Sequence, residues 1–142
     1  MPRIVCIDYG LKRTGIAVTD PLQIIATGLT TVETKQLIPF LLDYFSKEVV
    51  EKILIGMPKN WDDTDTDATP FVRKAIEELC KKFPTIPIVK IDERYTSKMA
   101  KNAMLEMGLK KKQRRNKALV DEIAATIMLQ QYLQDGEYSG FS

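Results

Sequence analysis

The chain has 142 residues, of which 44% are apolar, and its formal net charge is only +2 because 21 basic residues nearly balance 19 acidic ones. This length and apolar content predict one domain (residues 1–142) with a proper hydrophobic core. The sequence contains no histidine, which excludes histidine-based acid–base catalysis, Ser-His-Asp triads and histidine-ligated zinc. Any chemistry must come from carboxylates, lysine, arginine, hydroxyl groups and the backbone.

The two cysteines indicate a reducing compartment. Cys6 falls in an apolar strand pattern and Cys80 on an apolar helix pattern, so both are expected to be buried, reduced thiols. The N-terminus has no signal-peptide pattern, and no apolar run approaches the roughly 20 residues that span a bilayer. We therefore expect a cytoplasmic protein with no membrane partner.

The first predicted strand covers residues 4–7 and leads directly to a carboxylate, Asp8. Its four apolar residues in a row are typical of a strand buried on both faces. Burying an ionised carboxylate without a partner is costly, so we expect Asp8 at the mouth of the sheet, facing a cation. The alternative is that Asp8 and Gly10 only form a turn.

Two further strands are predicted at residues 15–19 and 23–31, connected by turns short enough to require an antiparallel meander. Helical spacing of apolar residues then predicts a helix over residues 35–47. A fourth strand is expected at residues 52–56, parallel to the first through a right-handed crossover.

The second half of the chain alternates between helices and one strand. Thr69 is expected as the N-cap of a helix with Pro70 at its first position. A fifth strand is predicted at residues 88–91, and helices at residues 96–108 and 118–134. The tail from about residue 136 is expected to be loose.

Carboxylates follow the expected parallel strands at one edge of the sheet. Asp8 follows the first strand and Asp92 and Glu93 follow the fifth, and ligands bind at the carboxyl ends of such strands. Asp121 shares a helix face with Ala124, at a spacing of three residues, and is expected to point toward the same edge. The alternative for Asp121 is a residue of the first turn that offsets the helix dipole.

An oxygen-only ligand set without histidine suits Mg²⁺ or Mn²⁺ better than zinc. Two such ions about 4 Å apart can activate water and stabilise the leaving oxygen of a phosphodiester. The sequence therefore predicts a two-metal-ion nuclease mechanism.

Four segments, at residues 8–17, 56–58, 92–97 and 121–125, resemble the YqgF family of Holliday junction resolvase-like proteins, also assigned as pre-16S rRNA nucleases. The resemblance implies an RNase H-like α/β fold, with a five-stranded mixed sheet in the order 3-2-1-4-5 and helices on both faces. It also implies that Asp8, Glu93 and Asp121 are the catalytic residues and hold the metal ions. Asp92 is not cleanly separated from Glu93 by sequence, and the acidic residues 62–67 depart from the family pattern.

Basic residues around these motifs are candidates for phosphate contacts, which require cations but read no sequence. The candidates are Lys12, Arg13, Arg94, Lys98, Lys111, Lys112, Arg114, Arg115 and Lys117. The run at residues 110–117 has the alternative interpretation of a solvated surface. Tyr9, Trp61 and Tyr95 are the nearby candidates for base stacking.

The leading hypothesis is a metal-dependent nuclease in 5′-end maturation of pre-16S rRNA during ribosome biogenesis, acting as a monomer or homodimer. The alternatives are a Holliday junction resolvase acting on branched DNA, and a non-catalytic nucleic-acid-binding factor of ribosome maturation. A lobe of an actin-like ATPase is disfavoured, because such enzymes need two lobes to enclose a nucleotide.

Overall fold

The computed structural model describes residues 2–58, 64–92, 102, 105 and 116–135, and it contains a five-stranded mixed sheet. The strand order is β3-β2-β1-β4-β5, with β1 antiparallel to β2 and parallel to β4. This is the order that the resemblance to the YqgF family implies. The strands are β1 (Arg3–Asp8), β2 (Arg13–Thr19), β3 (Ala26–Glu33), β4 (Val50–Met57) and β5 (Ile88–Asp92).

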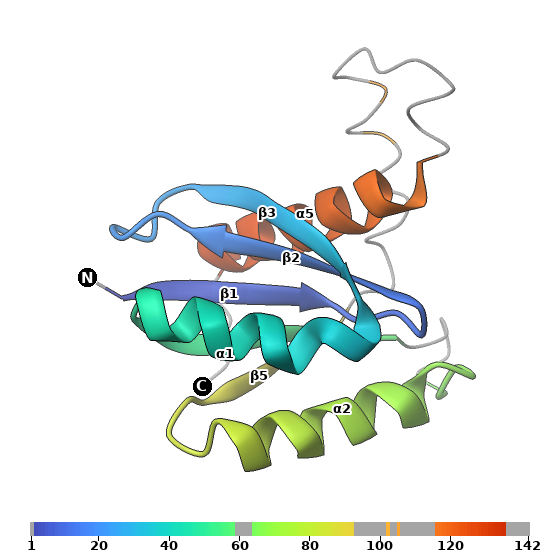
Figure 1. Cartoon of the computed structure of the whole chain (residues 1–142). Helices are drawn as coiled ribbons and strands as arrows, with labels where there is room; N and C mark the ends of the chain where they lie inside the picture. The colour runs from blue at the N-terminus through green and yellow to red at the C-terminus, as the bar shows by residue number, and fades with distance from the viewer. Residues whose placement is uncertain (1, 59–63, 93–101, 103–104, 106–115, 136–142) are drawn as a thin grey trace.

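Helices cover both faces of the sheet, as expected (Figure 1). On one face, α1 (Leu37–Lys47) follows the short 3-10 helix η1 (Thr34–Gln36), and α2 (Thr69–Lys82) packs beside it over β4 and β5. The opposite face carries α5 (Lys117–Asp135). The expected helix at residues 96–108 and the tail from residue 136 lie largely or wholly outside the described residues.

The third strand differs from the prediction, since it runs over Ala26–Glu33 rather than residues 23–31. Asp20 explains the late start: its Oδ1 accepts hydrogen bonds from the backbone amides of Ile24 and Ile25, both at 2.7 Å. Gln23 has a positive φ of 59°, which strand backbone does not adopt. A compact loop therefore replaces the first residues of the predicted strand.

Two local predictions for α2 are wrong. Cys80 is exposed rather than buried, because the buried positions Val72, Ala75 and Leu79 define a narrower core face than the sequence pattern indicated. Thr69 is not the N-cap but the first helical residue. Its hydroxyl donates to the Pro58 carbonyl at 2.8 Å instead, which ties the chain after β4 to the start of α2.

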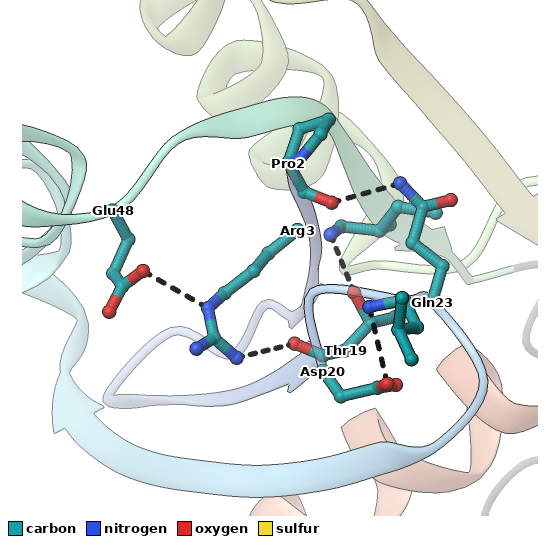
Figure 2. Close-up of polar contacts among 8 residues, drawn as sticks. Pro2, Arg3, Thr19, Asp20, Gln23 and Glu48 are labelled. Carbon is teal, nitrogen blue, oxygen red and sulfur yellow. Dashed lines mark hydrogen bonds and ion pairs between the residues drawn. The ribbon is translucent and has the colours of Figure 1, made fainter.

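The amino end of β1, opposite to Asp8, is held by polar contacts (Figure 2). The Arg3 guanidinium donates to Glu48 Oε2 at 3.2 Å and to the Thr19 carbonyl at 2.9 Å. Gln23 Nε2 donates to the Pro2 carbonyl at 3.0 Å. These bonds join the loops at the amino end of β1. The candidate site residue Asp8 lies at the opposite, carboxyl end of this strand.

The helix α5 lies unusually close to β2. A Cβ atom at Gly15 would lie 2.1 Å from the backbone oxygen of Asp121, so no side chain fits there. The Thr31 hydroxyl donates to the Ala118 carbonyl at 2.7 Å, and the Asn116 side chain caps the helix by accepting from the Ala118 amide at 3.1 Å. These contacts fix α5 in position along the sheet. Within the described part of the chain, no helix is long and apolar enough to cross a membrane.

Substitution of Gly15 by alanine should be much more damaging than the same change at Gly28. At Gly28 the nearest atom to an added Cβ is Glu122 Oε1, which can move away, whereas at Gly15 the obstacle is helix backbone. We expect Gly15→Ala to lower the free energy of unfolding by about 1–3 kcal/mol and Gly28→Ala by clearly less, measured by urea denaturation. Equal losses of unfolding free energy in the two variants would show that α5 can move away from β2 to make room for a Cβ at residue 15.

Asp20 should make the loop before β3 sensitive to acid. The backbone amide of Ile25, followed by those of Ile24 and Leu22, holds the pKa of the Asp20 carboxyl below its ordinary value. A depressed pKa contributes stability above the unfolded-state value of about 4, and this contribution is lost as pH falls through the folded-state value. The difference in melting temperature between wild type and Asp20→Ala should therefore shrink below about pH 4; a pH-independent difference would contradict this.

Candidate active site

Asp8 ends β1 on the sheet face that α5 covers. Along β1, Ile4 and Cys6 pack with α5 while Val5 and Ile7 pack with α1 and α2, and strand alternation puts Asp8 with the first set. The carboxylate is half-buried. It stands at the carboxyl end of a parallel strand, where the sequence predicts it.

Both strands beside Asp8 present a glycine at its level. The antiparallel register pairs Asp8 with Gly15 on β2. The parallel register pairs Ile7 with Ile55, so the next residue along β4, Gly56, follows at the level of Asp8. Laterally adjacent residues share a face of the sheet, so neither strand places a side chain over the Asp8 carboxylate.

Asp121 lies above this same point, on α5. The helix face toward the sheet carries the buried residues Ala124, Ala125 and Met128, and the Asp121 backbone lies against Gly15. Because Gly15 is the register partner of Asp8, Asp8 and the Asp121 backbone are both neighbours of this glycine. The first turn of α5 contains no acidic residue, which removes the alternative that Asp121 serves the helix dipole there.

Arg13 forms an ion pair with Asp121. Its Nε lies 3.5 Å from Asp121 Oδ2, with 37% and 28% of the two side chains exposed. The Arg13 Nε is buried and makes no hydrogen bond to any residue that the structure describes. Arg13 belongs to β2, which begins two residues before the strand predicted at residues 15–19, and its guanidinium reaches Asp121 at the candidate site.

Asp92 lies on the other face of the sheet. Val89 and Ile91 pack with α5, and alternation along β5 therefore places Asp92 opposite, paired in register with Met57. The structure thus separates Asp92 from Asp8 and Asp121, which the sequence could not do. Glu93 lies outside the described residues. Among those described, no group of three or more potential metal ligands of the Asp, Glu, Cys or His type occurs.

A threonine pair fixes the turn between β1 and β2. The Thr34 hydroxyl donates to the Gly10 carbonyl at 2.5 Å and contacts the Thr14 hydroxyl at 2.9 Å. The Thr34 amide donates to the Lys12 carbonyl at 2.9 Å. Sequence reasoning missed both threonines, because neither belongs to a charged or metal-binding pattern. They position the backbone from which Lys12 and Arg13 project.

Of the predicted nucleic-acid contacts, the structure describes the side chains of two: Lys12 is exposed on the turn and Arg13 pairs with Asp121. Lys117 begins α5. The remaining predicted contacts lie outside the described residues, namely Arg94, Lys98, Lys111, Lys112, Arg114 and Arg115.

Tyr9 is unsuited to base stacking, because it packs partly buried against the core under α1 and α2. Burial, with a smaller effect of the Glu78 charge, raises the pKa of the Tyr9 hydroxyl. The hydroxyl therefore stays protonated at neutral pH. The other two stacking candidates, Trp61 and Tyr95, lie outside the described residues.

Comparisons with known proteins identify the family of the chain. Residues 2–135 match the family described as RuvX, Holliday junction resolvase. A protein of Christiangramia forsetii named "Putative pre-16S rRNA nuclease" is 56% identical over 95% of this chain and 100% of its own. A protein of the same name from Flavobacterium psychrophilum is 58% identical over 94% and 97%, respectively.

Two solved structures share the fold at low sequence identity. T. thermophilus RuvC in complex with a Holliday junction is similar with a TM-score of 0.59 and 18% identity, over 96% of this chain and 97% of that one. The Fowlpox virus resolvase bound to Holliday junction DNA gives a TM-score of 0.60 and 11% identity, over 94% and 97%.

The sheet order and the likeness to RuvC define an α/β protein with an RNase H-like fold. The chain belongs to the RuvX family, which confirms the resemblance to the YqgF family.

Asp121→Asn should leave the fold intact. Its ion pair with Arg13 is about one-third exposed on each side, and such pairs contribute less than about 1 kcal/mol to stability. We expect the midpoint of urea denaturation to change accordingly little. A loss of several kcal/mol would contradict the partly exposed setting of this ion pair and would make Asp121 a structural residue.

Proposed function

We propose that this protein is a metal-dependent nuclease that hydrolyses phosphodiester bonds during 5′-end maturation of pre-16S rRNA. The observation that carries the proposal is the meeting of Asp8 and Asp121 at Gly15. The name shared by relatives that are more than 50% identical over nearly their whole length supports the choice of substrate.

The catalytic carboxylates in this proposal are Asp8, Asp121 and Glu93. Asp92 faces the opposite side of the sheet, which favours Glu93 as the residue that β5 contributes. The donor set fits Mg²⁺ or Mn²⁺, since the chain has no histidine and Asp8 and Asp121 offer carboxylate oxygens. When bound, two such ions would supply an activated water and stabilise the charge on the leaving oxygen.

The protein's own residues prepare this site before any substrate arrives. Gly15 holds the Asp121 backbone against β2, so the two carboxylates are positioned by strand and helix rather than by loops. The Arg13 guanidinium offsets the charge of Asp121. A cation at this position is also suited to binding a phosphate oxygen of the substrate.

A second candidate function is resolution of four-way DNA junctions. The family description names Holliday junction resolvases, and cutting a junction symmetrically requires two active sites related by a twofold axis. This function would therefore require a homodimer, whereas trimming an rRNA end can be carried out by a monomer. A binding factor without catalytic activity would instead retain affinity for RNA and cut neither substrate.

The experiment compares cleavage of a precursor 16S rRNA 5′ end with cleavage of a synthetic four-way junction, in Mg²⁺, Mn²⁺ or EDTA. We expect cleavage of the rRNA only in the presence of metal. Asp8→Asn, Asp121→Asn and Glu93→Gln should each lower the rate by at least about 100-fold, because each removes a carboxylate that would hold the metal ions, and the ions stabilise the charge of the transition state.

Two further variants serve as matched controls. Asp92→Asn tests the assignment of sheet faces, and Asp43→Asn changes an exposed α1 carboxylate paired with Lys47; both should retain activity. Loss of activity in Asp92→Asn with retention in Glu93→Gln would reverse the assignment on β5. Junction cleavage alone would favour the resolvase, and metal-independent binding without cleavage would favour the binding factor.

A further inference from the structure

A basic hollow of about 480 Å³ opens beside the candidate active site. The turn between β1 and β2 forms one wall and the junction of β3 with η1 forms the other. Its volume lies in the range of small-molecule and nucleotide sites. The described residues that line it are Leu11, Lys12, Arg13, Glu33 and Lys35, so among them three basic residues accompany one carboxylate.

The charges of the hollow are available for a ligand. Lys35 Nζ lies 3.3 Å from Glu33 Oε2, but these side chains are 76% and 66% exposed, and so exposed an ion pair contributes little. A phosphate can therefore replace Glu33 as the partner of Lys35 at small cost. Lys12 is exposed on the facing wall.

The two walls are fixed to each other by backbone and hydroxyl contacts. Thr34 lies between Glu33 and Lys35, its amide donates to the Lys12 carbonyl at 2.9 Å, and its hydroxyl donates to the Gly10 carbonyl. The hollow is therefore formed before a ligand binds, which reduces the entropic cost of binding.

Arg13 connects the hollow to the catalytic carboxylates. Arg13 lines the hollow, and its Nε lies 3.5 Å from Asp121 Oδ2. A strand with one phosphate near Asp121 would therefore place a neighbouring phosphate at Lys12 and Lys35. Leu11, which is 61% exposed, offers an apolar surface to the sugar or base between these phosphates.

We propose that this hollow binds the phosphodiester backbone of a single nucleic acid strand next to the scissile bond. This inference rests on the proposed function, which it deepens by identifying a subsite for the flanking nucleotide. Lys35 and Glu33 become determinants of substrate affinity.

Binding is measured by fluorescence anisotropy with single-stranded RNA and DNA of one sequence, in an Asp8→Asn background that prevents cleavage. Lys12→Gln/Lys35→Gln should weaken binding about 10-fold and lower the slope of log K against log salt by about 1.4, because each lost phosphate contact contributes about 0.7. Glu33→Gln should act oppositely and tighten binding, because it removes the carboxylate that repels a phosphate and releases Lys35 from its ion pair.

The matched control is Lys81→Gln/Lys82→Gln, which removes the same charge from exposed positions at the far end of α2. This control should leave the salt slope unchanged. An unchanged slope in Lys12→Gln/Lys35→Gln, or a loss equal to that of the control, would overturn the proposal. Neither result depends on cleavage, so failure of the subsite is distinguishable from failure of the nuclease assignment.

The position relative to the cut is tested by attaching a photo-crosslinker to Lys35→Cys. Because Cys80 is exposed and would also react, the variant is made in a Cys80→Ala background, with Lys81→Cys as the control site. Crosslinks within a few nucleotides of the cleaved bond are expected from Lys35→Cys and not from Lys81→Cys. Crosslinks at remote or random nucleotides would contradict the placement.

Discussion

The contact between the Asp121 backbone and Gly15 is the constraint on which the candidate site depends. Any Cβ at residue 15 would lie 2.1 Å from the Asp121 oxygen, so only glycine lets α5 approach β2 this closely. The same glycine is the register partner of Asp8. The absence of a side chain at Gly15 therefore determines how closely Asp121 on α5 approaches Asp8 on β1.

This close approach also explains the composition of α5. Ala124 and Ala125 are buried against the sheet, and larger side chains there would lift the helix away from β2. Thr31 and Asn116 fix the start of the helix. The start of α5 is thus fixed by Thr31 and Asn116, and its buried face by Ala124 and Ala125. Asp121 lies between these two regions of the helix.

Much of this arrangement could be predicted from the sequence. The mixed sheet and the carboxyl-edge position of Asp8 follow from apolar runs and short turns, which local patterns record well, whereas the strand order is what the resemblance to the YqgF family implies. The start of β3 could not be predicted, because it depends on the Asp20 carboxylate binding amides that compete with the strand. Cys80 was assigned to the core because helical periodicity does not show how wide a face the sheet covers.

The site itself was predictable only in part, for a similar reason. The residue types of Asp8 and Asp121 indicated a carboxylate site, but the ion pair with Arg13 and the threonine pair of the β1–β2 turn depend on contacts between distant segments. The sheet face of Asp92 also required the observed packing of Val89 and Ile91.

The placement of charge around the site has a physical consequence. With a net charge of only +2, long-range attraction of a polyanion is weak. Approach of a phosphate backbone to paired carboxylates therefore requires cations held nearby, and Arg13, Lys12 and Lys35 surround one hollow at that position.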